Sequence, residues 1–481
     1  MTTIANARVG DTIVDVTISG GRIASISPSD STPVAGEPID IDGRWLLPGL
    51  WDHHVHANQH ALAVRRIDLS AAASAAHAAR TMADNLSRIR IAEGQPVIGH
   101  GFRDGLWPDT PTVDLLDAAV PGMPAVLISG DLHCCWLNTP ALEMYGHAGH
   151  PTGVLLEDDC FEVVGRLGQV PDATLDEWVA EAASAAASRG VVGVVDYEMA
   201  DNLTSWRRRF AAGFDALRVQ AGIYTDHLDA AVAAGHSTGD VIEGSGGLLT
   251  VGPFKILTDG SLNTRTAFCV ENYPGTGERG LLTVPTEQLV PLLRTAWAAG
   301  IHPAVHAIGD DANRLALDAF EIVGCHGRIE HAQLLRPEDF PRFAALGVAA
   351  SVQPEHAMDD RDIAEHYWDG RTDRSFALRT LIDAGAELLL GSDAPVSPLD
   401  PWVTISAAVS RSRDGREPWH PEQTITVDEA LSASTHSRVE VGQVADLIAI
   451  DHDPNTCSGD ELRTMPVSLT LLGGHPTHRT L

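Results

Sequence analysis

Apolar runs typical of buried strands alternate with helical patterns through much of this 481-residue chain. A strand buried on both faces gives a short apolar run, whereas an amphipathic helix repeats its apolar residues at intervals of three and four. Strands and helices in alternation favour parallel βα units. The strand-like runs lie at residues 190–196, 217–224, 248–257, 301–308, 328–334, 348–354 and 387–392.

An earlier run ends in the stretch WDHHVH, at residues 51–56, and brings the number of runs to eight. Eight strands with intervening helices predict an α/β fold, a (β/α)8 barrel of the TIM type. The accompanying helical patterns lie at residues 174–189, 286–299, 311–323 and 376–384.

One connection is far longer than the others. About 130 residues separate the first run from the second, several times the length of an ordinary crossover. That stretch has strand-like runs of its own near residues 96–102 and 124–129. We therefore predict a subdomain inserted after the first barrel strand, at about residues 60–175.

Both ends of the chain are rich in short strand-like segments separated by turns. These segments lie at residues 12–18, 22–26, 444–451 and 467–472. Their shared character predicts a small β-sandwich domain built from both termini, residues 1–47 and 437–481. The barrel domain would then occupy residues 48–436.

In such a barrel, functional side chains project from the carboxyl ends of the strands. Alternate residues of a strand face the same side, so His54 and His56 share a face and His53 points to the opposite one. Histidine is the commonest metal ligand, and two imidazoles on one face can reach one ion. The other strand ends supply Lys255, His306, His331 and Asp393. Together these residues indicate a metal site.

Seven further stretches carry a family pattern: GFRDGLWPDTPT, SGDLHCCWLNTPAL, FKILTDGSLNTRTAF, VHAIGDDAN, IEHAQLL, VQPEH and GSDAPV. With the strand-end residues, they resemble the metal-dependent amidohydrolase superfamily, and more narrowly its third amidohydrolase family, which includes N-substituted formamide deformylase. The resemblance extends over nearly the whole chain. It departs near residues 432–443, where SASTHSRVEVGQ is shorter than the family's pattern before the C-terminal β segment.

The resemblance implies two divalent metal ions per chain. His54, His56 and Asp393 would bind one ion, and His306 and His331 the other. Zinc is the favoured metal, although mixed nitrogen and oxygen ligands also suit manganese or iron.

The resemblance also implies that a carbamate, formed on Lys255 from CO2, bridges the two ions. An unmodified lysine, with its pKa near 10.4, is cationic and a poor ligand. Asp259, on the same strand face, is the alternative bridging carboxylate. Hydrolysis at neutral pH needs a hydroxide, and a bound divalent metal lowers the pKa of its water to about 7. Asp393 could take the proton of that water and pass it to the leaving nitrogen, which makes it a catalytic candidate.

A second set of residues is expected to shape the substrate pocket, with the inserted subdomain covering the barrel mouth. His133 is the second catalytic candidate, as a hydrogen-bond donor to the developing oxyanion. Arg265 is expected to meet an anionic substrate group. The predicted substrate contacts are Trp107, Trp136, Asn138, Arg265, Gln353 and His356.

The favoured function is hydrolysis of a C–N bond in a small molecule (an amide, an N-substituted formamide or a cyclic amide) through a metal-bound hydroxide at a binuclear site. The alternatives are a mononuclear deaminase of an aminated heterocycle, an esterase or lactonase on the same site, and a non-catalytic barrel. Such deaminases use a glutamate in an HxxE arrangement, whereas Glu330 directly precedes His331 and is expected to point the opposite way. This position of Glu330 weakens the deaminase alternative. The complete set of metal ligands argues against a non-catalytic barrel.

The composition of the chain limits the kinds of partner that we expect it to bind. The net charge of −32, from 65 acidic and 33 basic residues, argues against nucleic acid and anionic membranes as partners. Six cysteines without a CxxC spacing favour reduced thiols and a cytoplasmic location. No signal peptide is evident, and no apolar run reaches the roughly 18 residues of a membrane helix. We expect a small-molecule substrate and, as the default for a closed assembly, a homodimer.

Overall fold

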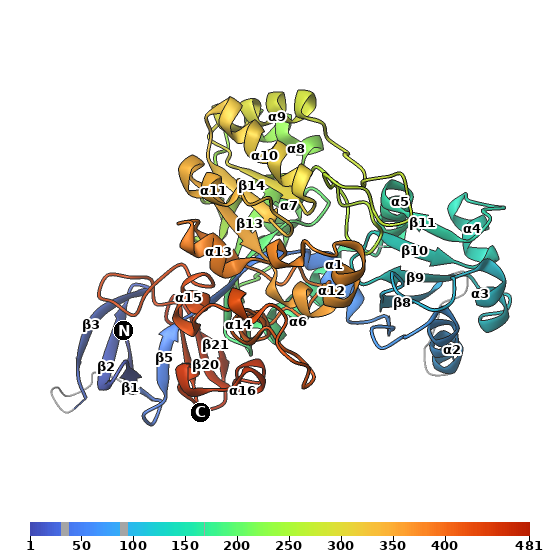
Figure 1. Ribbon diagram of the computed structural model, residues 1–481. Helices are drawn as coiled ribbons and strands as arrows, with labels where there is room; N and C mark the ends of the chain where they lie inside the picture. The colour runs from blue at the N-terminus through green and yellow to red at the C-terminus, as the bar shows by residue number, and fades with distance from the viewer. Residues whose placement is uncertain (30–37, 87–94, 168) are drawn as a thin grey trace.

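The computed structural model of the chain describes residues 1–29, 38–86, 95–167 and 169–481. Its centre is a barrel of eight parallel strands with helices around it (Figure 1). The strands are β6 (Leu50–Val55), β12 (Val191–Asp196), β13 (Arg218–Ile223), β14 (Leu249–Leu257), β15 (Pro303–Ala307), β16 (Gly327–His331), β17 (Val348–Val352) and β18 (Leu388–Leu390). They follow one another around the sheet in chain order, so the predicted (β/α)8 fold class is confirmed.

The barrel closes where its first and last strands meet. Val55 forms a parallel bridge with Ala394, just beyond β18. The backbone N–H of Asp393 donates to the carbonyl of His54 at 2.7 Å, and that of His56 donates to the carbonyl of Ala394 at 2.8 Å. This closure places the histidines of β6 beside Asp393.

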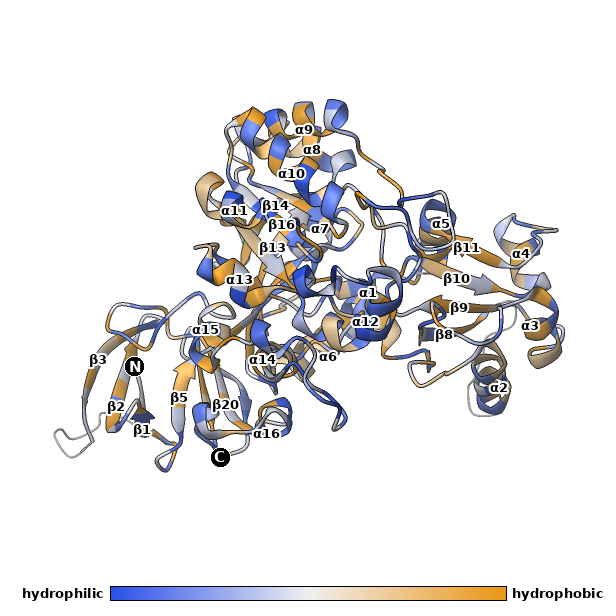
Figure 2. Cartoon of the chain, in the orientation of Figure 1, coloured by the Kyte–Doolittle hydropathy of each residue, from blue (hydrophilic) through white to orange (hydrophobic). Residues whose placement is uncertain are grey.

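Helices cover the outside of the barrel. They are α1 (Ala57–Ala63), α6 (Asp172–Ala187), α7 (Asn202–Ala211), α8 (Thr225–Ala233), α9 (Thr286–Ala298), α10 (Asp310–Val323), α11 (Phe340–Leu346), α12 (Pro354–Tyr367), α13 (Leu378–Asp383), α14 (Pro401–Ser410) and α15 (Val427–Ser432). Leu293 of α9 and Phe320 of α10 belong to the same buried cluster as Phe254 of β14. Helices such as α9 and α10 carry both hydrophilic and hydrophobic residues (Figure 2), as expected for helices with one buried face. Among the described residues, no helix is long and apolar enough to cross a membrane.

Strands from both ends of the chain pair in one sheet beside the barrel, and both termini lie there (Figure 1). Its order is β21-β20-β19-β5-β1-β2-β3, with β4 paired to β1. The bounds are β1 (Thr2–Val9), β2 (Thr12–Ser19), β3 (Arg22–Pro28), β4 (Ile39–Asp40), β5 (Trp45–Pro48), β19 (Leu447–Ile450), β20 (Val467–Leu472) and β21 (His475–Arg479), with α16 (Gly459–Arg463) between β19 and β20. Strands β5 and β19 pair antiparallel, and Ile4, Val16, Leu46, Leu447 and Leu469 lie in the buried core.

The insertion forms a second small unit, at the right of Figure 1. Its sheet has the order β11-β10-β9-β8-β7. Its elements are β7 (Ile67–Asp68), α2 (Ala75–Asn85), β8 (Val97–Phe102), α3 (Val113–Ala119), β9 (Ala125–Ser129), β10 (Cys134–Leu137), α4 (Thr139–Tyr145), β11 (Val154–Leu156) and α5 (Glu157–Leu167). It contacts the barrel through an Arg103–Asp359 ion pair of 2.6 Å and a 2.7 Å hydrogen bond that Ser261 donates to Asp131.

Candidate metal centre and cavity

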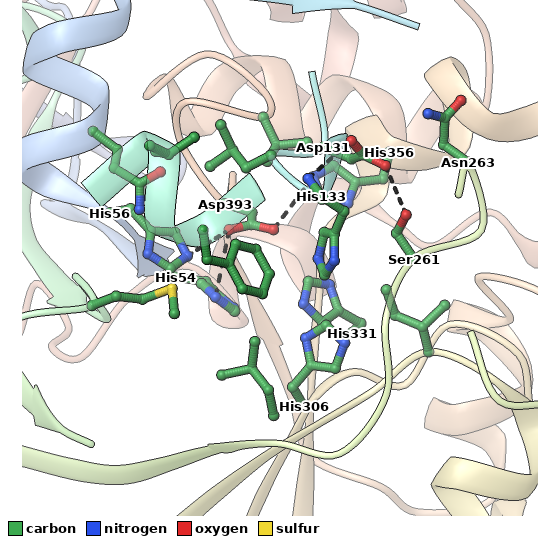
Figure 3. A pocket seen from close by; sticks show the side chains of 18 of the residues that line it. His54, His56, Asp131, His133, Ser261, Asn263, His306, His331, His356 and Asp393 are labelled. Atoms are coloured by element: carbon green, nitrogen blue, oxygen red, sulfur yellow. Dashed lines mark hydrogen bonds and ion pairs between the residues drawn. The ribbon is translucent and has the colours of Figure 1, made fainter. Parts of the chain in front are cut away.

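The closure of the barrel brings three donor groups together (Figure 3). Asp393 Oδ1 lies 3.2 Å from His56 Nε2 and 3.5 Å from His54 Nε2. A tetrahedral metal ion with bonds of about 2.1 Å holds its ligand atoms roughly 3.4 Å apart. The spacing of these three donors therefore fits one divalent ion.

A second group of donors shares the same aspartate. Donor atoms of His331, His356 and Asp393 lie within 4.8 Å of one another, and the rings of His306 and His331 have centroids 4.5 Å apart. This part of the site includes buried imidazole nitrogens that have no hydrogen-bond partner among the described residues, namely His306 Nε2, His331 Nδ1 and His356 Nε2. Buried polar atoms are almost always paired, so these nitrogens also fit metal ions at this site.

His331 reaches the centre through an unusual backbone conformation. Its φ is 75°, and that of Ala332 is 42°, in the left-handed region that side chains other than glycine rarely adopt. Asp393 also has a positive φ, 57°. Such conformations concentrate at functional sites, where the surrounding structure holds them.

Glu330 does not point away from the site, and this corrects the expectation from strand alternation. Its side chain is fully buried, with Oε2 2.8 Å from His54 Nδ1. Arg328 pairs with its other oxygen at 2.7 Å, and the hydroxyl of Tyr197 donates to it at 3.0 Å. The left-handed backbone at His331 interrupts the alternation, so consecutive residues both reach the interior. Burial favours the neutral acid, but the charge of Arg328 and the contact with His54 hold the pKa of Glu330 well below its usual range.

Lys255 lies at the floor of the site. Its Nζ is 3.2 Å from His54 Nε2 and 4.5 Å from the centre of the Tyr197 ring. Burial lowers the pKa of Lys255 to about 8. The uncharged amine is therefore more populated near neutral pH than in an ordinary lysine.

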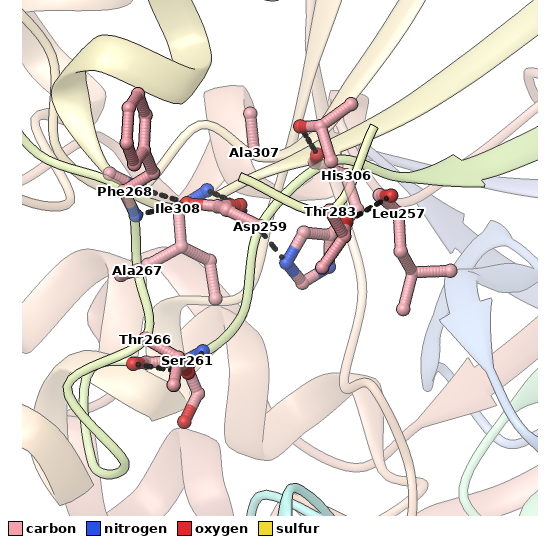
Figure 4. Close-up of polar contacts among 12 residues, drawn as sticks. Leu257, Asp259, Ser261, Thr266, Ala267, Phe268, Thr283, His306, Ala307 and Ile308 are labelled. Carbon is pink, nitrogen blue, oxygen red and sulfur yellow. Dashed lines mark hydrogen bonds and ion pairs between the residues drawn. The ribbon is translucent and has the colours of Figure 1, made fainter. Parts of the chain in front are cut away.

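The carboxylate of Asp259 binds backbone N–H groups and does not face the candidate metal centre (Figure 4). Its carboxylate accepts N–H groups from Phe268 at 2.9 Å, Ile308 at 3.0 Å and Gly309 at 2.8 Å. His306 Nε2 lies 3.4 Å from the same carboxylate. Both oxygens of Asp259 are thus engaged, which leaves little capacity for the bridging role considered as an alternative.

The insertion contributes a charged histidine. His133 Nδ1 lies 2.8 Å from Glu157 Oε2, at the start of α5. Burial disfavours the imidazolium, but the hydrogen bond and charge of Glu157 outweigh it and raise the pKa of His133 to about 9. The His133 ring lines the cavity, 6.2 Å from the ring of His306. It can therefore present a positively charged donor to the site.

Glutamine at position 157 is expected to lower the pKa of His133 toward its ordinary 6.5, because the charge that holds the proton is removed. In the native protein the raised pKa stabilises the fold fully below about pH 6.5, and this stabilisation is lost as the pH rises through about 9. NMR titration of the His133 ring and unfolding curves at pH 6 and 10 check both effects. An unchanged titration in Glu157→Gln would contradict the pairing. Glu143→Gln, an exposed change in the same unit, is the control.

A cavity of about 480 Å³ lies between the barrel mouth and the insertion. His54, His56, Lys255, His306, His331, His356 and Asp393 line one part of it. Leu132, Phe161 and Val164 of the insertion add apolar surface. The cavity therefore joins the candidate metal centre to a partly apolar chamber.

Three of the predicted substrate contacts, Trp136, Asn138 and Trp107, lie away from the cavity. Trp136 is fully buried in the core of the insertion and donates its indole N–H to the carbonyl of Thr112. Asn138 caps α4 and bonds backbone around it. Trp107 packs on Phe102 and donates to the carbonyl of Ala72. All three residues therefore make structural contacts, and none of them belongs to the described lining of the cavity.

Two further predicted contacts, Arg265 and Gln353, also lie outside the described lining of the cavity. Arg265 has a positive φ of 60° and stacks over Tyr367. Gln353 is buried, with Nε2 3.4 Å from His54 Nδ1, so it contacts a ligand candidate. Sequence reasoning missed Glu157, Asp131 and Tyr197, which become neighbours of the site only through contacts distant in sequence.

Comparison with known proteins identifies a protein family that this chain matches. The model of the family described as "Amidohydrolase family" matches residues 37–478. N-substituted formamide deformylase of Arthrobacter pascens is 27% identical over 522 aligned positions, covering 95% of this chain and 94% of that protein. Protein LONG AFTER FAR-RED 3 of Arabidopsis thaliana is 28% identical, covering 83% and 74%. The crystal structure of an uncharacterized metal-dependent hydrolase from Pyrococcus horikoshii OT3 has a TM-score of 0.78 and 25% identity, covering 95% of this chain and 99% of that one.

Proposed function

This chain belongs to the amidohydrolase family, and from that membership we propose that it hydrolyses a C–N bond of a small-molecule amide, N-substituted formamide or cyclic amide. One observation carries the proposal above all: the donor atoms of His54, His56 and Asp393 form one group at the barrel mouth, with His54 and Asp393 buried and His56 partly buried. The similarity to a formamide deformylase over nearly its full length supports the choice of bond. The same centre could act on an ester or lactone, and assaying esters and lactones beside the amides separates these alternatives.

The proposed centre holds two divalent ions, with zinc favoured. His54, His56 and Asp393 would hold the first, and His306 and His331 the second, with a carbamate on Lys255 between them. When bound, the ions would supply a water of lowered pKa and polarise the scissile carbonyl.

The protein's own groups would manage the protons. Asp393 Oδ1 faces His54 and His56, which leaves Oδ2 to take a proton from the attacking water. The same oxygen would then return that proton to the leaving nitrogen. The imidazolium of His133, held by Glu157, would donate a hydrogen bond to the developing oxyanion.

Lysine usage in the sequence supports a special role for Lys255. It is the only lysine among the 33 lysine and arginine residues of the chain. A guanidinium is always protonated and cannot form a carbamate with CO2, whereas a buried amine with lowered pKa can. Arginine occupies every other such position, which supports a role for this amine that arginine cannot fill.

Metal analysis coupled to a substrate screen tests the proposed function. Protein purified without chelators or metal-affinity resin is expected to contain about two equivalents of metal. It should hydrolyse N-formyl or N-acyl compounds, lose activity after chelation and regain it with Zn²⁺. About one equivalent, with activity on aminated heterocycles, would favour the mononuclear deaminase. No metal after add-back would favour a barrel without catalysis.

Replacing Lys255 with alanine is expected to remove most of the second equivalent of metal and most activity, because the bridging anion is lost. Millimolar propionate or acetate should restore part of both by occupying the vacated position. Because the chain has one lysine, ¹³CO2 should give one side-chain carbamate resonance by NMR in the native protein, and that resonance should be absent from Lys255→Ala. An intact metal pair in Lys255→Ala without added acid would contradict the bridge. Thr250→Val, a change near the start of the same strand and outside the proposed ligand set, is the control.

A small-molecule substrate and a homodimer remain our expectations for partners.

A further inference from the structure

Helix α1 and the turn after it form part of the cavity wall. Gln59 and Leu62 lie three residues apart on α1 and so share a face, and Arg66 follows in the bend beyond the end of the helix. All three residues line the cavity. Arg66 therefore stands in the same chamber as the proposed metal ligands.

The guanidinium of Arg66 has no hydrogen bond or ion pair with any residue in the described parts of the chain, although it is half-buried. Burial lowers the pKa of Arg66 to about 10, and the charge of Glu198 offsets this only in part. A cation withdrawn from water without a partner is unfavourable. An anion bound in the cavity would relieve that cost.

Neighbouring carboxylates are engaged elsewhere. Glu198 accepts the backbone N–H of Gln59 at 2.9 Å and that of Met199 at 3.1 Å. Asp359 pairs with Arg103 at 2.6 Å and with Arg413 at 2.8 Å. These acids are held by other donors, so the charge of Arg66 stays available to a ligand.

Two buried histidines lie near Arg66. Burial, together with the charges of Arg66 and Arg103, lowers the pKa of His100 to about 3, and the charge of Asp68 opposes this shift. The Nε2 atom of His100 is buried without a hydrogen-bond partner among the described residues. Burial lowers the pKa of His60 to about 4 as well. Burial therefore favours the neutral imidazole at both positions, and at His100 the two guanidinium groups add to that effect.

We propose that Arg66 binds a carboxylate of the substrate, so that the natural substrates are amides with a carboxylate at the end remote from the scissile bond. This rests on the proposed function. The planar fork of a guanidinium matches a carboxylate with two parallel hydrogen bonds. The nearby carboxylate of Glu198 favours a monoanion over a doubly charged phosphate. The predicted anion contact, Arg265, does not line the described cavity, and Arg66 takes that role.

Binding of straight-chain dicarboxylates tests the proposal without a known substrate. The zinc-loaded protein is titrated calorimetrically with dicarboxylates from succinate to sebacate, each compared with the monocarboxylate of the same length. One carboxylate of each ligand can bind at the metal centre, so the comparison isolates the second. The best-fitting dicarboxylate is expected to bind about 10- to 100-fold more tightly than its monocarboxylate in the native protein. Arg66→Gln should abolish this preference and Arg66→Lys should keep part of it. Arg207→Gln, an exposed change outside this cavity, should leave it intact.

A parallel assay compares N-formyl-6-aminohexanoate with N-hexylformamide, which lacks the carboxylate. The native enzyme is expected to favour the acid through a lower KM, and Arg66→Gln should raise that KM alone. An equal dicarboxylate preference in native protein and Arg66→Gln, or its absence from both, would overturn the carboxylate site even if both formamides are hydrolysed. If no amide is hydrolysed but the preference still depends on Arg66, the proposed function fails and the carboxylate site stands.

Discussion

Replacing Asp393 with asparagine is expected to reduce kcat/KM by about 10³-fold or more, the largest single effect at this centre. The change removes the carboxylate that faces His54 and His56, and with it the proposed proton carrier. Asparagine keeps the size of the side chain but cannot accept a proton at neutral pH. Steady-state kinetics on the best compound from the screen, with metal content measured on the same sample, check the result.

Asp362→Asn is the matched control, because it removes a carboxylate from the rim of the same cavity, where Asp362 pairs with Arg416. It should retain near-native kcat/KM. Near-native kinetics in Asp393→Asn would rule out Asp393 as the proton carrier. If Asp393→Asn instead loses metal and activity in parallel, the main role of Asp393 is that of a metal ligand.

Glutamine in place of Glu330 is expected to lower both stability and metal affinity. Arg328 would keep its charge in the barrel interior without a counterion, which costs about 3–5 kcal/mol of unfolding free energy for a buried pair. His54 would lose the acceptor that fixes its Nδ1 proton and directs Nε2 to the metal side. Losses of that kind weaken metal binding by about 10- to 100-fold. Urea unfolding and Co²⁺ titration measure the two effects separately.

Two further variants separate the roles of Glu330. Asp339→Asn, a buried carboxylate paired with Arg336 and Arg342, should lose stability but keep its metal affinity. The double change Arg328→Met and Glu330→Met should regain much of the stability without regaining metal affinity. Unchanged Co²⁺ affinity in Glu330→Gln would show that the contact with His54 does not position the ligand.

Much of this architecture could be predicted from local patterns. Buried strands of a parallel barrel are apolar on both faces, so runs such as 190–196 stand out, and their carboxyl ends identify His306 and Asp393 as neighbours. The predicted strand at 328–334 is shorter in the structure, as β16 ends at His331. The left-handed turn there could not be predicted from alternation, and it is why Glu330 was assigned to the wrong side.

The cavity wall was harder to predict than the strand ends. His133, Trp136 and Asn138 are close in sequence, yet only His133 lines the described cavity, because Trp136 lies within β10 and faces the core of the insertion. Glu157 meets His133 through antiparallel pairing of β10 with β11. Such contacts depend on how the insertion folds and docks, which residue spacing does not encode.

The burial of Lys255 affects how any assembly of this protein can be detected. Its side chain is 2% exposed, and no other residue of the chain offers a lysine amine. Crosslinkers that join lysines on adjacent subunits would find no lysine on the surface, so a negative result with them would not argue against a dimer. An added dihydrazide that links carbodiimide-activated acidic side chains, of which the chain has 65, or a mass measurement of the intact particle, reports on subunit association instead.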